Sequence, residues 1–249
     1  MRRVFAFIGS PLRERSNTYL LTKMMLEHLS HLDRRVESEI VTAGLVDLRY
    51  CQGCWTCLTK GSRFCPLDEN DDMGRLKEKM LQADFIVLGS PLRTSHMSGQ
   101  MKTFFDRLAS WYHIFGFAPK AGLTVVTTGG SEIEGLHQFM AMLMGCLGIK
   151  VVAGLDAVAF SPGRFLNRDQ AERSAREAAE RVLPYVIGEM PVESDEVMER
   201  CFQLVKGKVQ SGGKWLAGYA HWKERGWLGL NSYQELLERM ETGSLHGDE

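Results

Sequence analysis

Residues 84–98 read Asp-Phe-Ile-Val-Leu-Gly-Ser-Pro-Leu-Arg-Thr-Ser-His-Met-Ser, a short apolar run that leads into a polar loop. The apolar run has the length of a buried strand, and the Gly89-Ser90-Pro91 sequence ends it. A run without polar alternation is typical of a strand covered on both faces, as in a parallel sheet. We therefore predict a strand over 84–89, a loop after it, and a helix over 98–111.

The same strand-then-helix unit recurs on both sides of this segment. Further strands are predicted over 4–8, 36–41, 121–128 and 151–160, and further helices over 19–29, 73–81, 135–147 and 167–187. Strands that alternate with helices of about ten to fifteen residues indicate a parallel sheet with helices on both faces. The units are too few for an eight-fold barrel. The sequence thus predicts an α/β fold with a doubly wound, five-stranded parallel sheet.

Residues 191–249 depart from this pattern. They hold three of the five tryptophans, Trp215, Trp222 and Trp227, and are predicted to form two or three short helices. We therefore divide the chain into a main domain over 1–190 and a helical, Trp-rich C-terminal extension over 191–249. A segment this small is expected to dock on the main domain or on a second subunit.

The composition argues against several classes of protein. Hydrophobic residues make up 44% of the chain and charged residues 24%, and the formal net charge is -1. Because no long basic run is present, we expect no nucleic-acid partner. The N-terminal apolar stretch is too short for a signal peptide, and no window approaches the roughly 18 apolar residues of a membrane span. We expect a cytoplasmic protein without a membrane partner.

The loop after the first strand carries groups that suit a phosphate. Ser10, Ser16 and Thr18 supply hydroxyls, Asn17 supplies an amide, and Arg13 lies between them. The N-terminus of the following helix would add free N–H groups and a partial positive charge. Neither Gly-x-x-x-x-Gly-Lys nor Gly-x-Gly-x-x-Gly is present, which disfavours a nucleoside triphosphate site or a dedicated nicotinamide domain. The alternative is a plain turn whose hydroxyls only cap the helix.

The loop after the third strand, taken with the first, resembles the flavodoxin-like NADPH-dependent FMN reductase family. The family pattern is Ser-Pro-x-Tyr, then Ser-Gly-Gln-x-Lys, an apolar pair and Asp-Arg. The matching residues are Ser90-Pro91, Ser98-Gly99-Gln100-x-Lys102 and Asp106-Arg107. The resemblance spans about residues 1–190 and implies a flavodoxin-like fold that binds FMN and uses NAD(P)H. Arg93 replaces the usual Tyr, so it would pair with the flavin's pyrimidine edge or with a nicotinamide phosphate.

The resemblance also implies which residues contact the cofactor. In the first loop these are Ser10, Arg13, Ser16, Asn17 and Thr18. In the later loops they are Pro91, Leu92, Arg93, Thr94, Ser95, Met97, Ser98, Thr128, Gly129 and Gly130. His96 would lie beside the flavin ring, where it is a candidate proton donor to a reduced substrate or only lines the pocket.

Four of the six cysteines crowd into the loop after the second strand: Cys51, Cys54, Cys57 and Cys65. In a cytoplasmic chain this clustering indicates metal or redox chemistry before a structural disulfide. The spacing is similar to the bacterial ferredoxin run, and its longer last gap would let all four thiolates reach one [4Fe–4S] cluster. It resembles the iron–sulfur flavoproteins, a branch of the same family. A tetrahedral zinc site and a metal-free set of thiols are the alternatives.

Several other residues are interpreted as structural. Cys146 and Cys201 stand alone and are expected to be packing residues. The Asp71-Asp72 pair could be part of a metal site, but its position before a predicted helix favours a helix cap.

The prediction for the whole chain is an FMN-dependent oxidoreductase. Electrons would pass from NAD(P)H, or from a ferredoxin, through flavin and a [4Fe–4S] cluster to a quinone, an oxygen species or another small molecule. Successive binding of donor and acceptor at one flavin face would give ping-pong kinetics. The alternatives are a flavodoxin-type electron carrier and a flavin-free, zinc-stabilised scaffold. The resemblance implies a homodimer or homotetramer.

Overall fold

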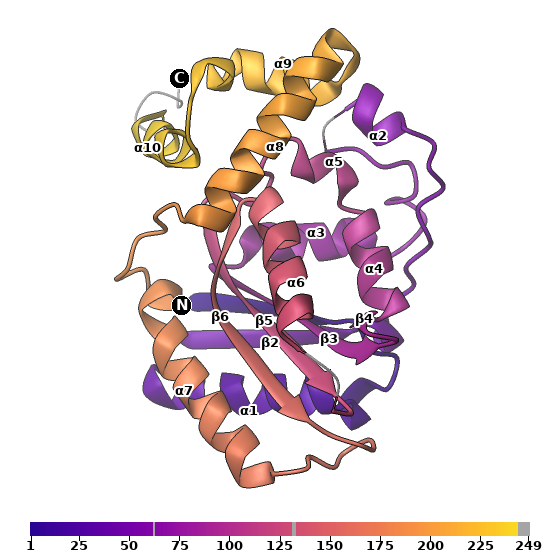
Figure 1. Ribbon diagram of the computed structural model, residues 1–249, viewed down its shortest axis with the longest axis vertical. Coiled ribbons are helices and arrows are strands. Elements are labelled where there is room, and N and C mark those ends of the chain that lie inside the picture. The colour runs from indigo at the N-terminus through magenta and orange to yellow at the C-terminus, as the bar shows by residue number, and fades with distance from the viewer. Residues whose placement is uncertain (62, 131–132, 244–249) are drawn as a thin grey trace.

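The computed structural model describes residues 1–61, 63–130 and 133–243 and has a parallel sheet at its centre (Figure 1). The strand order is β2-β1-β3-β5-β6, and the bounds are β1 Arg2–Ile8, β2 Val36–Thr42, β3 Phe85–Arg93, β5 Lys120–Thr128 and β6 Ile149–Val158. All neighbours in this order pair in parallel. The prediction of a doubly wound, five-stranded parallel sheet is confirmed. One short strand, β4 (His96–Met97), was not predicted and pairs antiparallel with β3.

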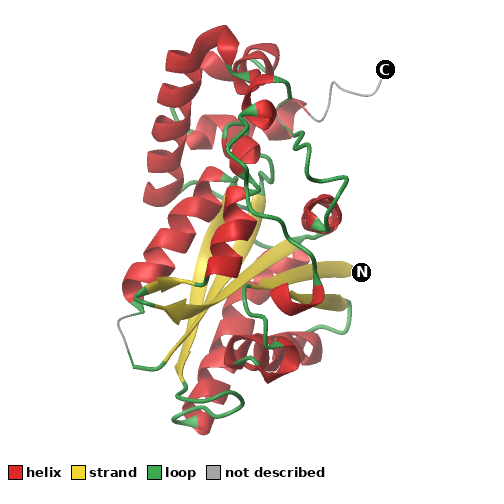
Figure 2. Ribbon diagram, turned by 90° about the vertical axis from the view of Figure 1, so that its right-hand side faces the viewer, coloured by secondary structure: helices red, strands yellow, loops and turns green. Residues whose placement is uncertain are grey.

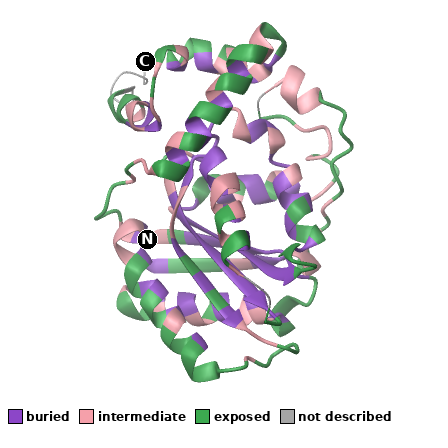
Figure 3. Cartoon of the chain, viewed as in Figure 1, coloured by how far each residue is buried: buried purple, intermediate pink, exposed green. Residues whose placement is uncertain are grey.

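Helices cover both faces of the sheet (Figures 1 and 2). One face carries α1 (Asn17–Leu32) and α7 (Arg168–Ile187), and the other carries α3 (Met73–Gln82), α4 (Gly99–Asp106) and α6 (Glu134–Cys146). Successive side chains of a strand point to opposite faces, so Phe85 packs on the α1–α7 side and Ile86 on the other. The edge strands β2 and β6 keep exposed or partly exposed positions, whereas the central strands β1, β3 and β5 are mostly buried on both faces and appear purple in Figure 3. This explains why the central strands have the continuous apolar runs seen in the sequence.

The predicted single helix over 98–111 is wrong, because two helices occupy this range. After α4 ends at Asp106, the chain turns at Arg107 and resumes as α5 (Ala109–Tyr112). The break carries the Arg107 side chain inward, where it pairs with Asp68 and Asp71. Apolar periodicity does not report such a pairing, since both carboxylates come from a segment more than thirty positions earlier.

The C-terminal extension packs against the end of α6 and the segment after α5. Its helices are α8 (Glu196–Gly212), α9 (Ala217–Glu224) and α10 (Tyr233–Gly243). They build an apolar cluster that includes Phe115 and Cys146 of the preceding chain. Trp222 is fully buried in it, and its Nε1 donates to the His113 carbonyl at 2.7 Å. The arrowheads of β5 and β6 point away from the extension (Figure 1), so it leaves the carboxyl edge of the sheet open.

Helices that cross a bilayer need about 20 consecutive, mostly apolar residues. Within residues 1–61, 63–130 and 133–243, no helix has the length and apolar character to cross a membrane.

Trp222→Ala should destabilise the protein by about 3–5 kcal/mol, the usual loss when a buried Trp is truncated. The side chain contacts Phe115, Phe202 and Trp227, so its removal leaves a cavity between extension and main body. Trp215→Ala is the matched control, because that ring is 58% exposed and, among the described residues, has a ring contact with Trp55 alone. Trp215→Ala should lower the free energy of unfolding by less than about 1.5 kcal/mol. Denaturant unfolding measures the free energy of unfolding of both variants. Equal destabilisation by the two substitutions would contradict this packing.

Candidate functional site

A hollow opens at the carboxyl edge of the sheet, where β1, β3, β5 and β6 end. It is lined by Ser10, Leu12, Ser16, Asn17, Thr18, Pro91, Arg93, Thr127, Thr128, Gly129, Ala159, Phe160, Ser161 and Pro162. The chain order of the strands reverses here, because β1 lies between β2 and β3. In open α/β sheets this switch point is where ligands bind. Hence the structure brings many of the sequence-predicted cofactor residues together in one place.

The start of α1 forms one wall of the hollow. Ser16 is its N-cap, and the Ser16 hydroxyl accepts a hydrogen bond from the Tyr19 N–H at 3.4 Å. The N–H groups of Asn17 and Thr18 lie in the first turn, where a helix offers no intrahelical acceptor. The Thr18 hydroxyl is 2.6 Å from the Thr127 hydroxyl and links this wall to the end of β5. The wall thus combines backbone donors, hydroxyls and the positive end of a helix.

Arg93 is the charged side chain on the hollow, and none of the described residues that line it is acidic. It stands at the end of β3, before a tight turn to β4 in which Thr94 and Ser95 have φ angles of 48° and 60°. Two successive positive φ angles define a type I′ hairpin turn, which usually requires Asn or Gly. Backbone strain of this kind concentrates at ligand-binding sites.

Some sequence-predicted cofactor residues are used inside the protein. Both ends of the Asn17 amide bond the loop after β6, with Nδ2 2.8 Å from the Ser161 carbonyl and Oδ1 2.8 Å from the Gly163 N–H. The buried Ser98 hydroxyl donates to the Gly9 carbonyl at 2.5 Å and caps α4. The Arg13 guanidinium turns away to the Gly44 carbonyl.

The remaining predicted residues lie around the hollow without lining it. Leu92 and Met97 are buried beneath the β3–β4 turn, and Gly130 follows the lining residue Gly129 with φ of 118°. His96 is exposed, and its ring packs edge-on against Phe139 with centroids 4.7 Å apart. The structure therefore places His96 in β4 with its ring against α6, outside the lining of the hollow.

Sequence reasoning missed the loop after β6, which contributes Phe160, Ser161 and Pro162 to the hollow. The strand-end rule would have found it, because β6 ends at the same edge as β1 and β3. Thr127 was missed as a partner of Thr18 for another reason: the pairing joins positions far apart in the chain.

The cysteine loop, residues 46–72, contains the short helix α2 (Thr56–Thr59). Cys51 and Cys54 are exposed, and Cys57 and Cys65 are half-buried. Burial raises the pKa of the Cys57 thiol, and so do the charges of the other three cysteines. Hydrogen bonds from Thr56 lower the pKa of Cys54. Within residues 1–61, 63–130 and 133–243, no three His, Cys, Asp or Glu side chains are gathered as a ready metal site.

A buried ion network lies beneath this loop. The Arg107 guanidinium pairs with Asp71 and, at 2.8 Å, with Asp68, and Lys77 Nζ is 2.6 Å from the other Asp68 oxygen. Asp71 also accepts a hydrogen bond from the Met73 N–H at 3.0 Å. Asp72 holds the N-cap position of α3, but its side chain makes no capping hydrogen bond. Asp71 bonds the first turn through Met73, and its main partner is Arg107.

Comparison with known proteins agrees with this geometry. The family model described as NADPH-dependent FMN reductase matches residues 2–161. An iron–sulfur flavoprotein of Archaeoglobus fulgidus is 28% identical over 228 residues, which is 91% of this chain and 100% of the relative. An iron–sulfur flavoprotein of Methanocaldococcus jannaschii is 29% identical over 194 residues, 74% of this chain and 97% of the relative.

Solved structures show the same fold. An apo NADH:FMN oxidoreductase superposes with a TM-score of 0.53 and 19% identity, over 80% of this chain and 94% of the other. RosB, solved with a bound flavin intermediate, gives a TM-score of 0.57 and 14% identity, over 84% and 88% of the two chains. The family model spans more than half of the sequence. The chain therefore belongs to the NADPH-dependent FMN reductase family.

Proposed function

We propose that this NAD(P)H-dependent oxidoreductase binds FMN in the hollow and a [4Fe–4S] cluster in the cysteine loop, and passes electrons to a small-molecule or ferredoxin acceptor. The observation that carries the proposal is the hollow itself. It lies at the strand-order switch point and is lined by hydroxyls, a helix N-terminus and Arg93, without an acidic side chain among its described residues.

The donor set of the hollow fits the phosphate end of FMN. Ser10, Ser16 and Thr18 are buried, so hydrogen bonds from this wall act in a low dielectric. Arg93 faces the same space and would add a charge-assisted hydrogen bond. In this proposal Arg93 binds the FMN phosphate in place of the ring or nicotinamide contact expected from the sequence. The ring would extend past Arg93 toward the rest of the turn at 91–98 and the glycines 129–130. FMN supplies the electron-transfer chemistry, and the protein orients it and limits access to it.

The nicotinamide donor and the electron acceptor would use one open face of the site in turn. The sequence has no dinucleotide-binding motif of its own, and the edge of the hollow is open to solvent. His96, in β4 next to the turn, does not line the hollow, but it would lie beside that face and is our candidate proton donor. Its imidazole is exposed, so a substrate could reach it without displacing buried groups.

The cysteine loop has the ligand chemistry of an iron–sulfur cluster. It carries four thiols, and the charges of Cys51, Cys54 and Cys65 all act on Cys57. Thiolates are soft ligands that select iron–sulfur clusters and zinc. Two relatives that align with most of this chain are named iron–sulfur flavoproteins, which favours the cluster over zinc. A homodimer or homotetramer in a cytoplasmic setting remains part of the prediction.

Arg93→Gln should weaken FMN binding about tenfold and leave riboflavin binding nearly unchanged. The reason is loss of a charge-assisted hydrogen bond to the phosphate, a contribution of about 1.5–3 kcal/mol before solvent screening. Quenching of flavin fluorescence on titration of apoprotein gives both affinities. The control is Arg15→Gln, which removes the same charge from the same region but not from the lining of the hollow. Equal weakening for FMN and riboflavin would place Arg93 at the ring instead.

Cys57→Ser should abolish iron binding and leave FMN bound, because a hydroxyl is a poor substitute for a thiolate on iron. Iron and acid-labile sulfide are assayed after anaerobic purification, with flavin content measured on the same sample. Cys146→Ser is the control, since that thiol is buried between α6 and α8, away from the loop. Iron retained by the Cys57 variant, or zinc in place of iron in the wild type, would refute the cluster.

A further inference from the structure

Arg107 is buried beneath the cysteine loop in a way that apolar packing does not require. Its side chain and that of Asp71 are both 0% exposed. Nη1 donates to the Arg49 carbonyl at 2.9 Å, and Nη2 donates to Asp68 at 2.8 Å. The guanidinium is therefore clamped in one orientation from three sides, by the first and last parts of the loop.

The same guanidinium is tied to one of the loop cysteines through Asp68. Arg107 Nη2 donates to the Asp68 carboxylate at 2.8 Å, and the Asp68 N–H donates to the Cys65 carbonyl at 3.0 Å. Cys65 is one of the four proposed ligands and lies only three positions before Asp68. The pair that holds Arg107 in place therefore also fixes the backbone at Cys65.

Two N–H donors in this region have no partner among the described residues. One is Arg107 Nε, and the other is Nε1 of Trp111, on the α5 helix that follows Arg107. Both side chains are more than nine-tenths buried. Donors left unpaired in a dry site are costly, and each calls for an explanation such as a redox role or a bound water, ion or ligand that completes it. Sulfur atoms of a cluster are acceptors of this kind.

The surroundings of Arg107 are electrically balanced before any thiolate forms. Arg107 and Lys77 supply two positive charges, and Asp68 and Asp71 supply two negative ones. Arg63, whose guanidinium stands 5.2 Å from the Trp111 ring centroid, adds a further cation on the loop side. Negative charge added at the cysteines would therefore be stabilised by the buried N–H donors and by the nearby cations.

We infer that Arg107 is a positioning residue for the proposed cluster: it orients Cys65 and donates hydrogen bonds to sulfur, which raises the reduction potential of the cluster. The inference rests on the cluster of the proposed function. Uptake of one electron adds one negative charge to the cluster next to a fixed guanidinium. The guanidinium therefore stabilises the reduced cluster more than the oxidised cluster. Hydrogen bonds to the sulfurs are a recognised control of cluster potential.

The test is an anaerobic potentiometric titration of the purified holoprotein, with dithionite as the electron donor and the cluster read by electron paramagnetic resonance. Iron and sulfide are assayed on the same samples. Arg107→Gln should favour the oxidised cluster at least tenfold, which is 59 mV toward more negative potential for one electron. Arg107→Lys keeps the charge but loses the planar fork, so its potential should lie between those of Arg107→Gln and the wild type.

Arg2→Gln is the matched control. Arg2 also pairs with an aspartate, Asp84 at 3.1 Å, and with a carbonyl, Ile187 at 2.9 Å, but at the amino end of β1. Arg2→Gln should leave the cluster potential unchanged, although it also removes an aspartate pair and a carbonyl hydrogen bond, here from a half-exposed side chain. A shift shared by both variants would therefore overturn the inference, because it would reflect general loosening of the fold.

The remaining outcomes separate the inference from the proposed function. If Arg107→Gln keeps FMN but loses iron, and Arg107→Lys restores iron, the positioning role is supported. If Arg107→Gln keeps both iron and the wild-type potential, the inference fails and the cluster stands. If both Arg107 variants lose FMN together with iron, Arg107 is only structural and the inference fails. A wild-type protein without iron and sulfide overturns the proposed cluster and the inference with it.

Discussion

Parallel pairing of the strands is the constraint on which the rest of the structure depends. Because β1, β3, β5 and β6 all run in one direction, the loops that follow them meet at one edge of the sheet. The chain order of the strands reverses at β1. Helices on either side of this point therefore cover opposite faces of the sheet, and the hollow lies between them. The hydroxyl-rich loop after β1 and Arg93 at the end of β3 therefore become neighbours through the sheet alone, without a direct bond between them.

The cysteine loop depends on a different kind of interaction. It contains one short helix and no strand in its described part, so few backbone bonds hold it. Asp71 and Asp72 tie its two ends together, since they accept hydrogen bonds from the Arg49 and Asp47 N–H groups at 3.0 and 2.8 Å. Arg107 then fastens this base to the end of α4. Arg107 also pairs with Asp68, whose N–H donates to the Cys65 carbonyl at 3.0 Å, so the network that closes the loop reaches Cys65.

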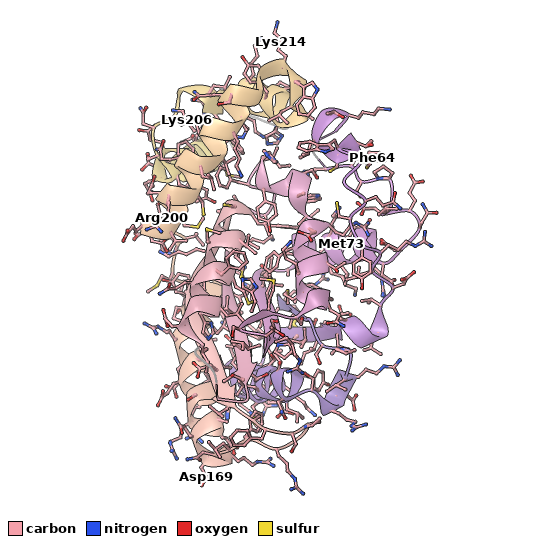
Figure 4. All side chains as sticks on the ribbon, turned by 45° about the vertical axis from the view of Figure 1, so that its right-hand side comes forward. Phe64, Met73, Asp169, Arg200, Lys206 and Lys214 are labelled. Atoms are coloured by element: carbon pink, nitrogen blue, oxygen red, sulfur yellow. The ribbon has the colours of Figure 1, made fainter. Side chains whose placement is uncertain are left out.

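The extension contacts the outer side of the same loop. Trp55, next to Cys54, has a positive φ of 59° and places its ring 5.8 Å from that of Trp215. Figure 4 labels Phe64 of the loop and Lys214 of the extension at the same end of the molecule. The cysteine loop therefore lies between the ion network on its inner side and the extension on its outer side. This position gives the Trp-rich segment a role in holding the loop that its sequence does not reveal.

The strands and the sheet could be predicted because burial on both faces leaves a continuous apolar run, as in residues 85–88. The hollow could be predicted in outline because strand ends and helix caps are local features. The roles of Asn17 and Ser98 could not, since an amide or hydroxyl looks the same in sequence whether it bonds a ligand or the Ser161 and Gly9 carbonyls. The helix break at Arg107 was missed because its carboxylate partners are remote in the chain.

The most direct test of the central claim is the visible spectrum of freshly purified protein, recorded without oxygen before and after addition of NADPH. The account predicts flavin bands on a broad iron–sulfur absorbance, and bleaching of the flavin bands by NADPH. A colourless protein would contradict the account outright. Flavin bands that NADPH leaves unchanged, but that reduced ferredoxin bleaches, would identify an electron carrier rather than a reductase.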